Sequence, residues 1–268
     1  MTAILKSLFV IALVAGLTVG ATSAFFSDEE KSTGNVFTAG AIDLQIDNTS
    51  YLNRVLNQGT TWGLSDLTNQ LFFNFIDLKP GDEGEDTISL HVNNNDAWAC
   101  VDIDITKNDD VSSTEPELED NDTPDDTNNT SDGELAQNLN FIFWTDDGDN
   151  VLETGEQVLT QGPASNILNG VTYTLADSQS NNVGGSVGTG LIGGQTYYIG
   201  KAWCFGTLSQ SPVTPDNNSP NNNSPTVDPG IDCDGSGLDN TTQTDTLMGD
   251  ITFTAVQKRN NTGFLCNT

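Results

Sequence analysis

Apolar and polar residues alternate along several stretches of the chain after position 40. In residues 41–47, Ile42, Leu44 and Ile46 fall on one face of an extended chain, and polar residues occupy the other face. Similar stretches predict further strands at 87–92, 99–105, 139–144, 170–175, 196–205 and 250–257. No stretch has the apolar period of an amphipathic helix three turns long. Short strands separated by Gly, Asn, Asp and Pro therefore predict an all-β fold, an antiparallel β-sandwich.

One region between the predicted strands fits no single pattern. Residues 55–75 are compatible with a short helix around 64–71, followed by a strand that ends near Ile76. We therefore expect a short helix and then a strand in this region.

Three segments are almost entirely polar, and they cover residues 108–134, 176–195 and 209–230. Segments of this composition bury too little apolar surface to offset the entropy lost on ordering. We expect them to form long, mobile insertions on one rim, outside the core. Because strand-like sequence resumes after each of them, we assign residues 25–268 to a single domain.

The first residues have the pattern of a secretory leader. Lys6 is the only charge before an apolar run over residues 8–21, and small residues follow up to Ala24. This order predicts a signal peptide over residues 1–24, with cleavage between Ala24 and Phe25. The alternative is a retained membrane anchor, but the run is marginal in length and lacks a basic flank.

The charge of the chain is strongly negative. It has 38 acidic and eight basic residues, and its net charge is −30. Nucleic-acid binding requires lysines and arginines that displace counterions from phosphates, so this balance argues against a nucleic-acid partner. The same balance argues against contact with an anionic membrane after cleavage. A solvated extracellular surface, or one that collects divalent cations, fits the charge.

Four cysteines predict two disulfides in an exported chain. Zinc binding is not indicated, because the sequence has no Cys-x-x-Cys pair. Three pairings are possible, and we favour Cys100 with Cys266 and Cys204 with Cys233.

Calcium is the one metal for which the sequence offers candidate ligands. The first candidate set lies around a glycine and consists of Asp146, Asp147, Asp149, Glu153 and Glu156. Closely spaced carboxylates can supply the six to eight oxygens that calcium takes. The alternative is a hairpin turn with Asp-Gly at its tip and solvated acids around it.

A second candidate set matches the first half of an EF-hand loop. Asp232, Asp234 and Ser236 would supply oxygens at its first, third and fifth positions. The acid of the twelfth position is missing, because Gln243 stands there. The alternative is a turn held by the neighbouring cysteine.

The sequence does not predict an enzyme. Its only histidine is His91, within a predicted strand, whereas zinc peptidases use two histidines one helical turn apart. The chain also lacks a Gly-x-Ser-x-Gly motif, a phosphate-binding loop and a dinucleotide-binding fingerprint.

Two blocks of sequence carry a family resemblance. Residues 25–44 read FFSDEEKSTGNVFTAGAIDL, and residues 78–83 read LKPGDE, followed by a strand and NNNDA at 93–97. In their order and spacing these blocks resemble the TasA and camelysin family of secreted biofilm-matrix fibre proteins. The resemblance implies a jelly-roll-like sandwich, export to the cell surface or matrix, and assembly into fibres. Camelysins are also classed as metallopeptidases, so a surface peptidase is one alternative.

The apolar start of the mature chain suggests how fibres would form. Phe25 and Phe26, with Val36 and Phe37, lie in a segment long enough to pair with the sheet edge of another copy. The resemblance implies the same donor-strand exchange, with copies of the chain as partners and contact with matrix or cell wall. The alternative is that the segment pairs with its own sheet. A monomeric adhesin or carbohydrate-binding module would then be the function.

Overall fold

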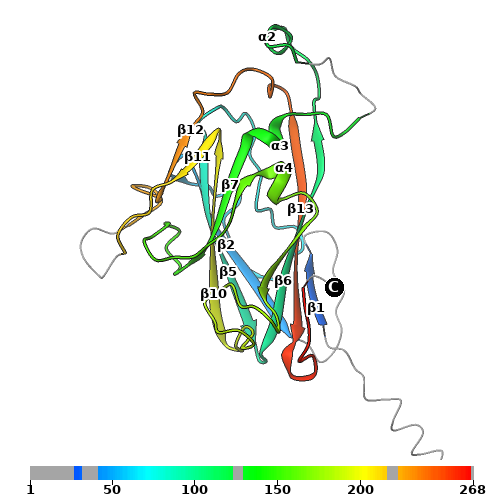
Figure 1. Cartoon of the computed structure of the whole chain (residues 1–268), viewed down its shortest axis with the longest axis vertical. Helices are drawn as coiled ribbons and strands as arrows, with labels where there is room; N and C mark the ends of the chain where they lie inside the picture. The colour runs from blue at the N-terminus through cyan, green and yellow to red at the C-terminus, as the bar shows by residue number, and fades with distance from the viewer. Residues whose placement is uncertain (1–26, 32–41, 123–128, 216–222, 267–268) are drawn as a thin grey trace, which may run out of the picture.

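Two antiparallel sheets face each other across a common core in the computed structural model, which describes residues 27–31, 42–122, 129–215 and 223–266 (Figure 1). The four-stranded sheet has the order β1 (Ser27–Lys31), β13 (Thr246–Gln257), β6 (Ala97–Asp109) and β9 (Val171–Ala176). The path of the seven-stranded sheet runs through β3 (Val55–Leu56), β2 (Asp43–Leu52), β5 (Glu83–Asn93), β10 (Gln195–Phe205), β7 (Leu139–Asp146) and β8 (Val158–Pro163). Its remaining strand, β4 (Trp62–Ser65), pairs with β2.

The smaller elements lie at the ends and margins of the sandwich. A hairpin of β11 (Thr207–Gln210) and β12 (Ile231–Asp234) forms a third sheet. The helices of the described residues are short, and they are α2 (Glu115–Glu119), α3 (Leu135–Asn138), α4 (Ala164–Ile167) and the 3-10 turn η1 (Lys258–Asn260). The first and last strands, β1 and β13, are neighbours in a jelly-roll-like arrangement, so the predicted fold class is confirmed.

The core follows the alternation of the sequence. Along β2 every second side chain is buried, so Ile42 just before the strand, Leu44 and Ile46 face the opposite sheet. Ile88 and Leu90 of β5 extend the same layer. All seven predicted strand positions lie in strands, several of which extend beyond the predicted ends.

The seven-stranded sheet is buried on its outer face as well. The β11–β12 hairpin and the segment after β7 cover a second apolar cluster, whose members include Ile142, Trp144, Leu152, Leu208 and Ile231. This burial on both faces explains why β10 reads as a nearly continuous apolar run and not as an alternating one.

Two glycines in the central strands make room for tryptophans on the next strand. Gly200 is the register partner of Trp144, and a Cβ atom at Gly200 would lie 2.1 Å from the indole ring. Gly84 stands in the same relation to Trp203, with 2.4 Å to the indole nitrogen. A larger residue at either position would have to displace a fully buried ring.

Two expectations from the sequence are wrong. Residues 64–71 form no helix, and no strand ends at Ile76, which is 88% exposed in a loop. The polar segments also contribute to the interior, because Val183 and Leu191 join the main core. A few well-placed apolar residues anchor a loop that composition alone assigns to solvent.

Both disulfides have the pairing that the sequence favoured. Cys100 of β6 is bonded to Cys266 near the end of the chain, and Cys204 of β10 is bonded to Cys233 of β12. Within the described ranges, no helix has the length and apolar character needed to cross a membrane. The predicted leader lies outside these ranges.

Candidate functional site

The edge of the four-stranded sheet is the first candidate site. Strand β1 pairs antiparallel with the second half of β13, from Ser27 opposite Val256 to Lys31 opposite Thr252. The pairing leaves the first half of β13 joined to β6 alone among the described strands. The predicted cleavage residues Ala24 and Phe25, and the donor residues Phe26, Val36 and Phe37, lie outside the described residues.

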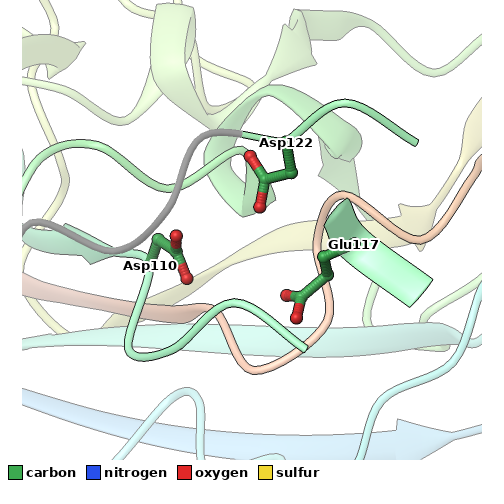
Figure 2. A group of neighbouring side chains, drawn as sticks. All are labelled: Asp110, Glu117 and Asp122. Carbon is green, nitrogen blue, oxygen red and sulfur yellow. The ribbon is translucent and has the colours of Figure 1, made fainter. Parts of the chain in front are cut away.

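A cluster of three carboxylates forms the second candidate site (Figure 2). Asp110 follows β6, Glu117 lies on α2 and Asp122 follows α2, and one oxygen of each lies within 4.8 Å of the others. Figure 2 shows their side chains converging on one space. Asp110 and Glu117 are buried. These residues lie in a segment that the sequence assigned to solvent, and the burial of Glu117 through α2 could not be read from its composition.

Helix α2 is held in place by its own cap. Thr114 and Glu117 form a capping box, in which the backbone N–H of Thr114 donates to the Glu117 carboxylate. The Thr244 hydroxyl lies 3.5 Å from the other oxygen of Glu117. Within the described part of the chain, the donors that fix this carboxylate are neutral, so they do not compensate its charge.

Further acids surround this cluster. Burial, with the negative charges of Asp122, Asp245 and Asp110, raises the pKa of Glu134 to about 7. Burial also raises the pKa of Asp245 to about 6, although its carboxylate accepts hydrogen bonds from the backbone of Glu134 at 2.7 Å and Leu135 at 2.8 Å. The raised pKa values indicate that this site holds protons more readily than exposed carboxylates do.

The predicted calcium loop lies between β7 and β8. The structure brings Asp146, Asp147 and Asp149 within 4.8 Å of one another, as the sequence suggested. Burial raises the pKa of Asp146 to about 6 and that of Asp149 to about 7.

The two glutamates of this loop stay outside the group of three. Burial raises the pKa of Glu156 to about 8, and its carboxylate accepts a hydrogen bond of 2.8 Å from the Glu153 backbone. Glu153 is itself buried, and it accepts a hydrogen bond of 2.5 Å from the Asn223 amide. The loop is also the hairpin connection that was the alternative, because β7 and β8 pair directly.

The second predicted calcium set lies on strand β12 and in the turn after it, not in a loop between two helices. Asp232 and Asp234 are exposed residues of strand β12, and Asp234 accepts a hydrogen bond of 2.9 Å from the Ser236 backbone. Hydrogen bonds from the Ser236 side chain and backbone lower the pKa of Asp234. A strand cannot wrap its side chains around an ion as an EF-hand loop does.

His91 makes two polar contacts on the outer face of β5. Its Nε2 lies 3.0 Å from Asp47, and its Nδ1 lies 3.1 Å from the Thr196 hydroxyl. Both ring nitrogens are thus engaged by neighbouring strands, and within the described ranges no group of metal-ligating side chains includes His91.

A cavity of about 280 Å³ opens between the two sheets. Leu159 of β8 and Tyr173 of β9 line it, together with Phe143, Ile251 and the buried Lys201. Both β8 and β9 are terminal strands of their sheets, so the cavity lies on the side where the sandwich is not closed by a strand. Its lining is mainly apolar and differs from the polar surface that a sugar requires.

Comparison with known proteins gives no identification. No family model matches the chain, and no curated protein matches it significantly. The functional conclusion therefore rests on the residues and the geometry described above.

Proposed function

We propose that this chain is an exported structural subunit that assembles into extracellular fibres through its N-terminal segment. The observation that carries the proposal is the pairing of β1 with β13 at the edge of the four-stranded sheet. Backbone pairing does not depend on which chain supplies the strand, so the same edge can accept β1 of a neighbouring copy.

Exchange of this strand would produce a filament. The donating strand and the accepting edge are different surfaces, so the contact is heterologous and repeats from copy to copy. Without β1, strand β13 would present unpaired backbone donors and acceptors at the edge of the sheet, and pairing with a strand of another copy would satisfy them. The two disulfides support an oxidising location such as the cell surface or matrix.

Calcium belongs to the same proposal as a stabilising ion. The carboxylates of the Asp110 cluster are close enough together to bind one cation, and those around Asp146 are close enough together to bind another. The raised pKa values of Glu134 and Asp149 support this assignment, because a divalent cation would relieve the same repulsion that retains their protons.

The main alternative is a monomeric surface adhesin in which β1 stays on its own sheet. The two functions differ only in whether β1 and β13 come from one chain or from two. The metallopeptidase alternative has no supporting observation, because His91 contacts Asp47 and Thr196 and joins no described metal-ligand group.

A pair of cysteines across the β1–β13 contact would distinguish these functions. Glu29 and Thr254 are register partners, and residues facing each other in antiparallel strands are close enough for a disulfide. In the double variant Glu29→Cys/Thr254→Cys, strand exchange predicts a ladder of covalent multimers on a non-reducing gel. A monomer with fully oxidised cysteines would contradict fibre assembly through β1.

Deletion of residues 25–37 provides a second test. We expect the shortened chain to remain folded and to form no filaments under the electron microscope. A control that scrambles the order of the same residues keeps their number and composition. Normal filaments from the deletion variant would show that another surface drives assembly.

A further inference from the structure

Three polar side chains lie together at the centre of the seven-stranded sheet. They are Asn48 of β2, Asp86 of β5 and Lys201 of β10, and these three strands are direct neighbours. Each is 0% exposed and shares the inward face with apolar residues of its own strand. Full burial of an amide, a carboxylate and an amine costs free energy that the fold has to recover.

Asp86 contacts both of the other groups. Its Oδ2 lies 2.9 Å from the Lys201 Nζ, and its Oδ1 accepts a hydrogen bond of 3.1 Å from the Asn48 Nδ2. The Asn48 Nδ2 also donates to the Thr60 carbonyl at 2.7 Å, which fixes the orientation of the amide. The amine and the amide nitrogen therefore meet at one carboxylate.

Aromatic rings surround the amine. The Lys201 Nζ lies 3.7 Å from the centre of the Phe73 ring and 5.9 Å from that of Phe72. Apart from Asp86, no acceptor contacts this nitrogen within the described part of the chain. Burial lowers the pKa of Lys201, although the charge of Asp86 opposes the shift. Burial thus favours the neutral form of the amine, and the Asp86 carboxylate, at 2.9 Å, is within reach of its proton.

We propose that Lys201 and Asn48 form an intramolecular isopeptide bond, and that Asp86 carries the protons of the reaction. The Lys201 ammonium first gives a proton to Asp86, which produces a neutral amine and a carboxylic acid. The Nζ lone pair then attacks the Asn48 Cγ. Asp86 delivers its proton to the departing Nδ2 and accepts one from Nζ.

The reaction needs no external reactant. The Cγ–Nζ bond forms, the Cγ–Nδ2 bond breaks, and ammonia leaves. No oxidation or reduction takes place, and Asp86 ends with the proton that Lys201 gave up. The product holds a neutral amide where a buried ion pair stood, so the cost of two buried charges is removed.

The bond would join β2 covalently to β10 across β5, the strand that lies between them. The inference does not depend on fibre assembly, but it would have a mechanical role in a fibre. Residues 25–37 immediately precede β2 in the chain, so tension on that segment would reach β10 through a covalent bond. Hydrogen bonds between strands would then carry less of the load.

Mass spectrometry of the folded chain, after reduction of its disulfides, provides the test. We expect a mass lower by one ammonia molecule than the mass calculated from the sequence of the purified chain, and a branched peptide that links Lys201 to Asn48. The peptide is the decisive observation, because Asn169 before Gly170 can also lose ammonia by forming a succinimide. Trypsin should not cut after Lys201 in the unfolded protein, because acylation blocks its amine.

Two results on the folded chain would overturn the proposal. An unmodified mass, with free Asn48 and Lys201 peptides, would show that the three residues form only an ion pair with a hydrogen bond. A branched peptide that links Lys201 to Asp86 with loss of water would show that the amine bonds to Asp86 and not to Asn48.

Variants test the role of each group. Lys201→Arg retains a positive charge and should abolish the branched peptide, whereas the control Lys107→Arg should retain it. Asp86→Asn preserves the shape of the side chain and removes its acid, so we expect the bond to be lost. A complete bond in folded Asp86→Asn protein would overturn the role of Asp86. If a variant fails to fold, the peptides of the unmodified chain decide the question alone.

Discussion

Strand β5 carries one buried acid on each face, and the two acids differ in whether a cation compensates their charge. Asp86 points into the sandwich, is fully buried, and has Lys201 at 2.9 Å as its counter-charge. Glu85 is also fully buried on the other face, and neither of its carboxylate oxygens has a hydrogen-bond partner among the residues that the structure describes. Burial and the charges of Glu83 and Asp86 raise the pKa of Glu85 to about 8, against a smaller opposing effect of Arg54.

The difference shows two solutions to one problem. On the inner face, the register places a lysine directly opposite Asp86, so the chain supplies the compensation itself. On the outer face and in the acidic loops, the raised pKa values indicate that protons reduce the charge, and a cation would do the same. The inner-face residues, which are paired or bonded to one another, should therefore contribute less to the pH dependence of stability than the uncompensated acids do.

The largest effect is expected from removal of the inner counter-charge. Lys201→Met leaves Asp86 buried without its partner and also removes the proposed bond to Asn48, so we expect a loss of at least about 3–5 kcal/mol in the free energy of unfolding. Chemical denaturation with intact disulfides measures it. The control Lys107→Met removes a partly exposed pair with Asp109 and should cost less than about 1 kcal/mol. Equal losses in the two variants would remove the distinction between the inner face and the surface.

Calcium should have the next largest effect. An ion that binds only the folded chain stabilises it by about 2.7 kcal/mol at a hundredfold excess over its dissociation constant. We expect calcium to raise the Tm and chelator to reverse the rise. Glu117→Gln should reduce the rise, whereas Glu115→Gln, an exposed change on the same helix, should preserve it. A Tm that does not respond to calcium would leave protons as the compensation in both loops.

The pH dependence tests the outer face of β5. A folded pKa near 8, against an ordinary value of 4.5, means that the folded state holds a proton which the unfolded state releases. Stability should therefore fall as the pH rises from about 5 to about 8. Glu85→Gln should raise the free energy of unfolding at pH 8 by about 1–2 kcal/mol. The full pKa shift, at about 1.4 kcal/mol for each pKa unit, would give more, but the buried amide of the variant also lacks hydrogen-bond partners.

The comparison at two pH values checks this interpretation. At pH 5 the variant and the unmodified chain should differ little, since both carry a neutral side chain at position 85. A constant difference from pH 5 to pH 8 would mean that Glu85 acts by shape and not by titration.

The smallest effect is expected at the exposed tip of the β7–β8 loop. Asp147→Asn in calcium-free buffer should change the free energy of unfolding by less than about 0.5 kcal/mol, because this side chain is exposed. In calcium, the same variant should lose part of any rise in Tm that comes from this loop. An equal rise in both proteins would assign calcium stabilisation to the Asp110 cluster alone.

The strands were predictable because each has an apolar face fixed by alternation. The positions of Asn48, Asp86 and Lys201 were also within reach, since each is in phase with buried residues of its own strand. The contact between these three side chains could not be predicted, because it depends on the strand order β2-β5-β10, and this order comes from contacts distant in sequence.

The loops set the limit of prediction from sequence. Short strands such as β8 and β11 have no regular alternation, and they form because longer strands offer them an edge or a cover. The Asp110 cluster was missed because polar composition was equated with solvation. Helix α2 buries Glu117 through a cap and one turn, which needs few apolar residues.

The disulfide between Cys204 and Cys233 closes the polar segment 209–230 into a ring. A protease that cuts this segment once would leave both pieces attached to the same molecule. The β11–β12 hairpin would stay paired, because both of its strands lie inside the ring. The chain can therefore be cut in this polar loop and keep its covalent continuity, which in the proposed fibre would leave the subunit in place.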